Sequence, residues 1–585
     1  MKKQKTAEST QSKYVLPIFS ALCALSASGA IIGVTLLSSP ALQWRLFVGL
    51  LPEYAVCFAI AFVAVYGYGS ILPKIAYLTL PISCLACGVR TVFRSAPYVS
   101  PLAVSLVFAL LCAAAIAACI WALGQSPAPK KQEKAALSTA FAVLGTLAAA
   151  AASLAVFAFV LSGRLHSLQT DGTPLAQYGQ MLYYMQHSGQ AFTTLGSGAP
   201  ESYFATQFAP LWYLVLPVYI LSKHSMLAVG IALYALMLSA LVPLWRICRR
   251  HALAPWQTAA LCAACALCPL LVGGGAAGGS LAMLSLPLLL WVADAMEGKH
   301  PYLALIPLAL CLCIGFEVTV WTLFVCLYLT LANKQNRRAG LICTAVSSVA
   351  LIATTVYLAL VQSPVLTALF SGIGLQIDKK LLFLALLLLP FAILPLLAKQ
   401  KAALVLLFPL VLFHLIANAS VYSGVFCAYA FPAVAVAAIL AVKGAANLRA
   451  EIRGIALARL LPALALCIAA LCTTTYTATL IDLYASPEEQ AETDAMRMHE
   501  LLDALPENAS VTASESLLCA LHDRTWLFSL ETDPANPATN VIVLDLREDF
   551  VPTGMEAYTV AYYKSLGYTL RDDLSRDGIL AVLYK

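Results

Sequence analysis

The sequence predicts an all-α polytopic membrane protein that carries a small α/β domain at its C-terminus. Of the 585 residues, 61% are hydrophobic and 11% are charged, and the mean hydropathy is +0.84. A helix needs about 20 apolar residues to cross a bilayer, and the apolar segments before Leu483 accommodate about fifteen such helices. From residue 484 onward polar residues become frequent. This composition excludes a set of soluble domains.

The distribution of charge predicts the orientation of the chain. The net charge of +6 lies mainly at the ends of apolar segments, where it reports membrane orientation, and no nucleic-acid partner is expected. The basic start MKKQK places the N-terminus in the cytoplasm. We expect residues 1–135 to form an N-terminal extension of about four transmembrane helices. Residues 136–483 are expected to form the transmembrane core, and residues 484–585 an extracytoplasmic domain of a multi-pass cell-membrane protein.

One apolar segment does not fit a series of simple crossings. The run FAPLWYLVLPVYILSK (208–223) is short and contains Pro217, and as a span it would place the following RICRRH outside. We interpret it as a re-entrant or interfacial helix on the outer face, after an outer loop at 163–207. All later basic clusters then face the cytoplasm. Spans are expected near 137–162, 225–247, 257–275, 278–296, 302–315, 318–333, 340–361, 381–398, 402–417, 425–443 and 455–481.

A single carboxylate, Glu317, stands in the middle of the apolar stretch 301–332. Basic residues flank both ends of this stretch, so it is expected to form a helical hairpin with Glu317 at its outer turn. A charge in or near lipid is costly and commonly functional. The alternative is a carboxylate wetted at a loop or bonded to neighbouring helices. Asp294 and Glu297, in contrast, end the preceding span beside Lys299, where ion pairing is expected.

The C-terminal region alternates helix-like and strand-like segments. The segment EEQAETDAMRMHELLDAL is helix-like, SVTAS, TWLFS and NVIVLDL are strand-like, and AYTVAYYKSL is again helix-like. This alternation predicts a small α/β domain, and about 100 residues suffice for independent folding. It contains no Gly-rich phosphate loop, nucleophile elbow or metal-spaced His/Cys set. A binding or lid domain beside the outer mouth is the simpler interpretation.

Polar and aromatic side chains concentrate in the outer loop and the interfacial helix. Carboxylates beside aromatic rings suit sugar or phosphate handling, because rings pack on apolar sugar faces and a carboxylate can act as a base or bind a divalent cation. Tyr and Trp also collect at membrane interfaces in general, and Asp171 before Gly172 also fits a simple turn. The candidates in this region include Asp171, Tyr178, Gln180, Glu201, Gln207 and Trp212.

Several stretches carry a resemblance to a known family. They are YGQMLYYMQHSGQAF, YFATQFAPLWYLVLPVYILSK, FEVTVWTLFVCLYLTL, AYAFP, and ENASVTASESLLCALHDRTWLFS followed by NVIVLDL. From about residue 136 to the end, the chain resembles the bacterial membrane-protein family called "domain of unknown function 2079". Its span, large outer loop, interfacial segment and span ending in Arg-Arg are similar to membrane glycosyltransferases of the GT-C architecture.

The resemblance implies a GT-C-like helical bundle that transfers a sugar from a polyprenyl-phosphate donor to a cell-envelope glycan acceptor on the outer face. Asp171 or Glu201 would serve as base or metal ligand, with a divalent cation left open as cofactor, and Glu317 would orient the donor or the acceptor. Lys379 and Lys380 would neutralise lipid phosphate or simply snorkel to the interface. The remaining substrate-binding candidates are Tyr178, Gln180, Gln207, Trp212 and Tyr429.

The chain also departs from the pattern of this family. Gln180 stands where the family usually has an acid, and Tyr203, Thr206 and Gln207 stand where it tends to have histidines and an acid. Only Glu317 of the usual Lys-Glu-Asp at the helical turn is kept. Two other classes of function therefore stay open: a non-catalytic membrane protein that binds envelope lipid or glycan, and a transporter.

Overall fold

The computed structural model of the chain describes residues 132–168, 173–196, 200–276, 280–363, 377–417, 427, 429–448, 451–452, 455–456, 462, 465, 469, 489–530, 539–547 and 556–585. The expected N-terminal helices in residues 1–131 lie outside these residues, as do Asp171 and most of the expected span near 455–481.

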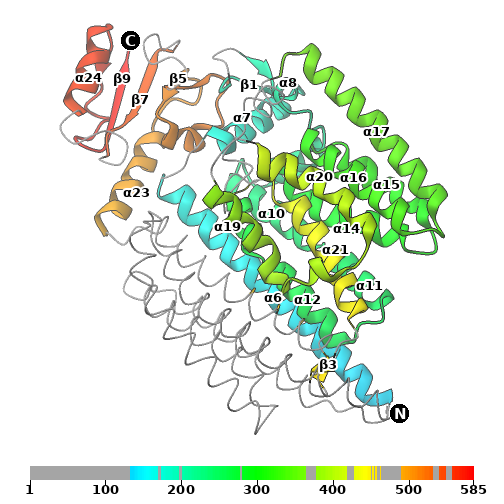
Figure 1. Ribbon diagram of the computed structural model, residues 1–585. Coiled ribbons are helices and arrows are strands. Elements are labelled where there is room, and N and C mark those ends of the chain that lie inside the picture. The colour runs from blue at the N-terminus through cyan, green and yellow to red at the C-terminus, as the bar shows by residue number, and fades with distance from the viewer. Residues whose placement is uncertain are drawn as a thin grey trace, which may run out of the picture.

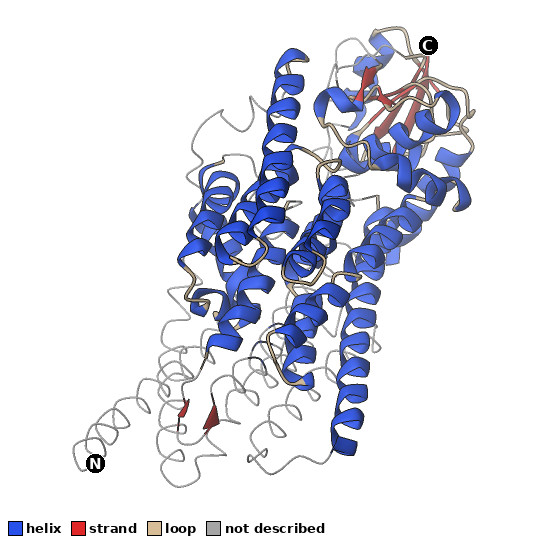
Figure 2. Cartoon of the chain, turned by 90° about the vertical axis from the view of Figure 1, so that its right-hand side faces the viewer, coloured by secondary structure: helices blue, strands red, loops and turns tan. Residues whose placement is uncertain are grey.

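A bundle of helices forms most of the described chain, and a domain that contains a β-sheet lies at one end of it (Figures 1 and 2). We call this the domain end of the bundle. The α-helices are α6 (Gln132–His166), α7 (Thr173–Ser188), α8 (Tyr203–Thr206), α9 (Trp212–Leu221), α10 (Met226–Leu238), α11 (Leu241–Arg250), α12 (Pro255–Ala266), α13 (Pro269–Ala276), α14 (Ser285–Met296), α15 (Leu305–Cys311), α16 (Phe316–Ala332), α17 (Arg337–Leu360), α19 (Ile377–Leu388), α20 (Leu407–Leu410) and α21 (Phe431–Asn447).

Short segments of tighter or wider helix, and two small strand pairs, complete the bundle. The 3₁₀ segments are η1 (Leu281–Leu284), η2 (Pro301–Ala304), η3 (Leu389–Phe391), η4 (Leu394–Leu397) and η5 (Lys401–Leu406), and the π-helical segment is η6 (Val411–Ile416). The antiparallel pairs join β1 (Phe192–Thr193) to β2 (Glu201–Ser202), and β3 (Glu451–Ile452) to β4 (Ile455–Ala456).

Four helical segments of the described chain are long and apolar enough to cross a membrane. They are Thr139–His166, Met226–Arg250, Pro255–Gly275 and Arg337–Leu360, and they coincide with four expected spans. The other apolar helices are shorter, so the expected number of about fifteen is not reached there. Proline is one cause: the expected span 381–398 becomes α19, η3 and η4, because Pro390 and Pro395 lack the amide hydrogen that a continuous helix needs.

Two expectations about local structure agree with the described fold. α15 and α16 are joined by residues 312–315, so the apolar stretch around Glu317 is a helical hairpin. α9 has 10 residues and contains Pro217, which makes it too short to cross a bilayer. The length agrees with the expectation that α9 does not cross the membrane, and its interfacial or re-entrant position stays a prediction.

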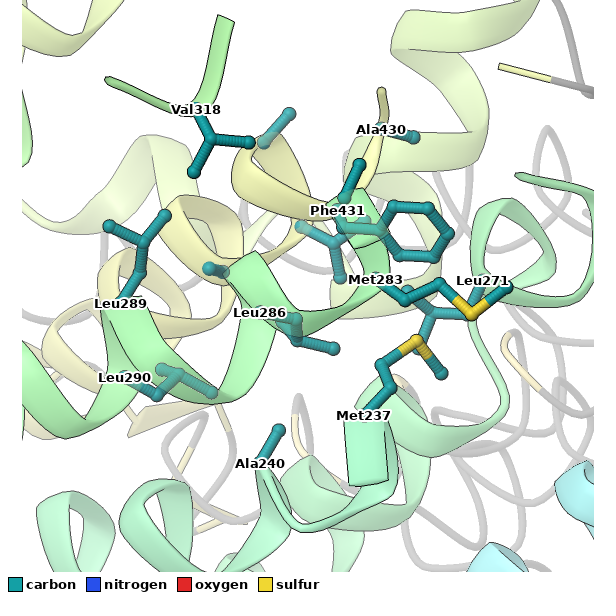
Figure 3. Packing of buried hydrophobic residues seen from close by; sticks show 14 of the residues in the cluster. Met237, Ala240, Leu271, Met283, Leu286, Leu289, Leu290, Val318, Ala430 and Phe431 are labelled. Carbon is teal, nitrogen blue, oxygen red and sulfur yellow. The ribbon is translucent and has the colours of Figure 1, made fainter. Parts of the chain in front are cut away.

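Apolar side chains from several helices of the bundle form one continuous core. Figure 3 shows Met237 near the end of α10, Leu271 from α13, Leu286 from α14 and Phe431 from α21 converging in this core. All four side chains are almost completely buried, with 0% or 1% of their surface exposed. Burial of a large apolar side chain contributes about 1.5–3 kcal/mol when it leaves water, although transfer from lipid contributes less. Close packing therefore fixes the positions of the helix ends.

The C-terminal residues form the expected α/β domain. Its five-stranded sheet has the order β6-β5-β7-β9-β8, with β5 parallel to β6 and β7, and β9 antiparallel to β7 and β8. The elements are α23 (Glu489–Asp503), β5 (Val511–Ala513), η8 (Glu515–Leu521), β6 (Leu527–Ser529), β7 (Val541–Asp545), α24 (Glu556–Ser565), β8 (Thr569–Leu570) and β9 (Leu580–Tyr584).

The end of the bundle opposite the C-terminal domain holds two carboxylates with little exposed surface, and the first is Asp294. Arg246 Nε lies 2.9 Å from one carboxylate oxygen of Asp294, and Arg250 Nη2 lies 2.9 Å from the other. The expected ion pairing of Asp294 is therefore confirmed, and its partners come from α11. Lys299 lies beyond the end of α14 and is exposed, whereas the last turns of α11 pack against α14 and bring both arginines to Asp294.

Glu297, the second carboxylate, is also held by basic side chains from other parts of the chain. His251 Nε2 lies 3.2 Å from one oxygen of Glu297, and Lys443 Nζ of α21 lies 2.8 Å from the other. Burial alone raises the pKa of Glu297, but the hydrogen bond from His251 and the charge of Lys443 outweigh burial and hold this pKa at about 2. Ion pairing at this end is thus present, but between helices rather than along one.

Candidate functional site

Glu317 lies in the first turn of α16, at the domain end of the bundle. Its surface is 2% exposed, and the N-terminus of a helix stabilises a negative charge. Gly315 immediately precedes the helix, and a Cβ at this position would lie 2.9 Å from Gln207 Nε2. A side chain at residue 315 would therefore displace the amide group of Gln207, and glycine leaves room for this close approach.

Two tyrosines from the outer loop lie within electrostatic reach of Glu317. Burial raises the pKa of Tyr178 to about 12; a hydrogen bond with Tyr203 opposes this shift, and the charge of Glu317 adds to it. Burial, Tyr178 and Glu317 together raise the pKa of Tyr203 well above 10. Both phenols are therefore protonated at neutral pH, and each has a hydroxyl hydrogen to donate.

An amide and two further aromatic rings complete the group. Tyr203 Oη donates to Gln207 Oε1 over 2.7 Å, and Gln207 Nε2 lies 3.4 Å from Tyr429 Oη. The ring of Tyr178 lies 4.9 Å from that of Trp212 and 5.9 Å from that of Tyr203. We call these residues the Glu317 cluster: Glu317, Tyr178, Tyr203, Gln207, Trp212 and Tyr429.

The structure thus brings together five of the ten residues that the sequence predicts for the site. Tyr203, which links Tyr178 to Gln207, was not among them. Tyr203 begins the short helix α8, and Gln207 directly follows that helix, so this single turn brings the two side chains together. Their spacing in the sequence alone does not distinguish a tyrosine that links two residues of a site from an ordinary interfacial tyrosine.

Glu201 and Gln180 have other positions. Glu201 is exposed on β2, where it pairs with Thr193 across the strands. Gln180 is completely buried in α7, where its carbonyl oxygen accepts from Thr193 Oγ1 and the Thr194 amide at 2.9 Å each, and its amide nitrogen donates to Thr194 Oγ1 over 2.8 Å. The same nitrogen also reaches the Arg524 carbonyl of the C-terminal domain at 3.3 Å. This arrangement makes Gln180 a link between α7 and that domain.

The two lysines of α19 differ from each other. Lys379 is exposed, whereas Lys380 is 7% exposed and its Nζ donates to the carbonyl oxygen of Leu415 over 2.6 Å. Leu415 belongs to the π-helical segment η6, and π-helical turns are frequent at functional sites. The preceding residue, His414, is fully buried and stacks on Phe383 with ring centres 4.2 Å apart.

The C-terminal domain is firmly docked on α7 and the end of α6. Arg547 donates to the carbonyl oxygens of Ser167 and Leu168 over 2.9 and 2.8 Å, and its guanidinium is held by Asp545. A Cβ at Gly179 would overlap the ring of His522, so this glycine permits the close approach of the domain to α7. Tyr178 and Gln180, the neighbours of Gly179 in α7, are therefore held in place by the helical bundle and by the docked domain together.

A divalent cation has no ready set of ligands in the described part of the chain. No group of three or more His, Cys, Asp or Glu residues there is arranged to hold a metal ion. Glu317 is the one carboxylate in the Glu317 cluster as defined above. The chemistry of this cluster is that of a single buried acid among hydroxyl and amide donors.

The fold and the cluster define a class: a multi-helix membrane protein with an α/β domain docked over a buried carboxylate at one end of its bundle. The family model described as "Predicted membrane protein (DUF2079)" matches residues 164–578, and the chain belongs to this family. The match includes the Glu317 cluster and most of the docked domain. No curated protein matches the chain.

Two solved structures resemble the fold. ArnT from Cupriavidus metallidurans bound to undecaprenyl phosphate has 14% sequence identity and a TM-score of 0.49, and the match covers 76% of this chain and 98% of ArnT. ArnT from the same organism in the apo state has 14% identity and a TM-score of 0.45, and the match covers 73% of this chain and 96% of ArnT.

Proposed function

We propose that this protein is a GT-C-like membrane transferase that moves a sugar from a polyprenyl-phosphate donor to a cell-envelope acceptor. The observation that carries the proposal is Glu317, a carboxylate that is 2% exposed, stands at a helix N-terminus and lies within electrostatic reach of two buried tyrosine hydroxyls. Buried charge at the edge of an apolar bundle is costly and commonly functional. In this proposal the domain end faces outside and the N-terminus lies in the cytoplasm.

In the proposed reaction a hydroxyl of the acceptor attacks the anomeric carbon of the donor sugar. The bond between that carbon and the phosphate oxygen breaks, and polyprenyl phosphate leaves with the electron pair. Glu317 would accept the proton of the attacking hydroxyl, a role that requires the acceptor to bind within hydrogen-bond reach of the carboxylate. Because the phosphate leaves as a stable anion, the step needs no proton from the protein.

The other members of the cluster would bind and orient the sugar. The hydroxyls of Tyr178 and Tyr203 and the amide of Gln207 offer donors and acceptors that match sugar hydroxyls. Trp212 packs against Tyr178 and holds that ring in place. Orientation of two reactants in one site lowers a barrier even without strong chemical assistance. The docked domain would hold α7 in position while substrates enter.

The test uses the full-length protein in lipid nanodiscs with polyprenyl-phosphate-linked sugars, and mass spectrometry follows donor consumption. We expect wild-type turnover, and loss of turnover in Glu317→Gln, which keeps the shape but removes the base. Glu500→Gln is the matched control, because Glu500 is an exposed glutamate on α23. Absence of turnover with every donor and with added divalent cations would contradict the proposal.

One observation favours a second function, a non-catalytic protein that binds envelope lipid or glycan. The positions around Glu317 are filled by Tyr203 and Gln207, which are neutral and hydrogen-bonded to each other. Neutral donors bind sugars without catalysing transfer. Binding of the donor without turnover, with the same affinity in Glu317→Gln, would support this function over the transferase.

A further inference from the structure

We propose a binding site for the phosphate headgroup of an anionic phospholipid at the end of the bundle opposite the C-terminal domain. The site is the cavity between η2 and the turn from α16 to α17, with a volume of about 570 Å³. Its lining includes three cationic side chains, Lys334, Arg337 and Arg338. We call it the basic pocket. The inference is independent of the proposed transferase activity.

The three cations of the basic pocket differ from the basic side chains that pair with Asp294 and Glu297. Arg246 and Arg250 pair with Asp294 of α14, and His251 and Lys443 pair with Glu297, which directly follows that helix. Lys334, Arg337 and Arg338 are exposed, and none of the ion pairs among the described residues includes them. Their charge is therefore available to an anion from outside the chain.

The helix that begins in the basic pocket also favours the binding of an anion. Arg337 and Arg338 are the first two residues of α17, where the positive end of the helix dipole repels cations and attracts anions. Asn336 precedes the helix, and asparagine is a favoured residue for capping its free amides. Here its side chain does not cap: it donates instead to the carbonyl oxygens of Met296 and Gly298, over 2.8 and 3.1 Å.

Those bonds also make the pocket rigid. Asn333 Nδ2 donates to the same Met296 oxygen over 2.9 Å, so two asparagines fasten the turn to the end of α14. The first amides of α17 consequently have no side-chain cap at Asn336, and the cations stand on a fixed support. Phosphate oxygens would satisfy both the amides and the guanidinium groups.

An apolar surface continues from the pocket along the bundle, which favours a lipid over a free anion. Leu341 lines the pocket and is 53% exposed, and Val349, Ile352 and Val356 extend this exposed face along α17. The ring of Tyr302, also 56% exposed, lies on the other side of the pocket. A phospholipid would place its phosphate on the cations and its acyl chains on α17. Basic pockets between transmembrane helices bind anionic headgroups in this way.

The test compares lipid binding to two double variants of the purified full-length protein. Native mass spectrometry measures the affinity for phosphatidylglycerol and for phosphatidylcholine with the same acyl chains. Arg337→Gln/Arg338→Gln should lower the preference for phosphatidylglycerol about tenfold or more, because each cation near a lipid headgroup contributes roughly fivefold. The control Lys399→Gln/Lys401→Gln removes two exposed lysines from another turn at the same end, and should retain the preference.

Three outcomes decide the proposal. A selective loss in Arg337→Gln/Arg338→Gln supports it. Equal losses in both double variants would overturn it, since the arginines would then contribute only to the general charge of this end. Displacement of phosphatidylglycerol by inorganic phosphate at comparable concentration would also overturn it, because the acyl chains would then add nothing. If the double variant fails to fold, Lys334→Gln replaces it and Lys401→Gln becomes the control, with an expected loss of about fivefold.

Discussion

At the domain end of the bundle Glu317 lies near tyrosine hydroxyls, whereas at the opposite end Asp294 and Glu297 are each held by two basic side chains. All three carboxylates are buried or nearly so. An ion pair with two cations satisfies a buried charge and fixes the helices that carry it. The neighbours of Glu317 include two tyrosines, whose hydroxyl groups suit the binding and orientation of a substrate. The comparison therefore predicts a structural role for the paired acids and a chemical role for Glu317.

The largest expected effect on stability comes from Asp294. Replacement by alanine in Asp294→Ala removes two ion pairs and leaves Arg246 and Arg250 beside a cavity. Because both arginines still reach water in part, we expect a loss of about 3 kcal/mol, at the lower end for a broken buried pair. Thermal unfolding in detergent measures it. Asp573→Ala is the control: Asp573 pairs with Arg571 on the surface, and its removal should not change the melting temperature measurably. Equal effects of the two substitutions would contradict a structural role for Asp294.

Glu317→Gln should change the stability of the protein much less than Asp294→Ala does. Loss of the charge removes a buried carboxylate without opening a cavity, so the free energy of unfolding should stay within about 1 kcal/mol of the wild-type value or rise. If the transferase proposal holds, turnover should fall on the order of 100-fold or more, the usual contribution of a general base. Measurement of both quantities on one preparation separates the two roles. A large loss of stability in Glu317→Gln would place Glu317 with the structural acids instead.

The sequence singled out Glu317 as a candidate and predicted ion pairing for Asp294 and Glu297, but it did not predict the partners in those ion pairs. Glu317 is conspicuous because it is the only charged residue in a long apolar stretch, and Tyr178 and Trp212 follow from the aromatic content of the outer loop. The partners of Asp294 could not be predicted, because Arg246 and Arg250 are distant in sequence and reach it through helix packing. Ion pairs between helices depend on register and packing, which hydropathy does not report.

Hydropathy also fails to report the contacts of Gln180 and the interruption of two expected spans. Gln180 is a residue type that commonly binds ligands. Here its side chain instead bonds to Thr194 and to the C-terminal domain, and the second contact exists only because that domain docks on α7. The expected spans 381–398 and 402–417 divide into short α-helical, 3₁₀ and π-helical segments, because prolines at 390, 395 and 409 interrupt helices whose hydropathy is continuous. Composition thus predicts the class of fold, and tertiary contacts decide the roles of single polar residues.

Glu297 gives a pH test of the structural end. Its pKa is about 2 in the folded protein and near 4.5 in a free side chain, so the folded state favours the ionised form. A lowered pKa contributes stability that is present above about pH 4.5 and is lost as the pH falls toward 2. We expect a loss on the order of 2 kcal/mol over this range. Melting temperatures of the wild type and Glu297→Gln between pH 7 and 3 should converge at low pH, and parallel curves would contradict the shift.

The smallest expected effect comes from Tyr203, which tests whether the Glu317 cluster acts as a unit. Tyr203→Phe removes the hydroxyl that donates to Gln207 over 2.7 Å but keeps the ring beside Tyr178. A single hydrogen bond contributes about 1 kcal/mol, so we expect a small fall in melting temperature and a severalfold fall in donor binding or turnover. Tyr562→Phe, on the exposed face of α24, serves as control. A double-mutant cycle with Glu317→Gln then measures the coupling: additive effects would mean that the tyrosine supports only the fold, whereas a smaller combined effect would show that Tyr203 acts through the site of Glu317.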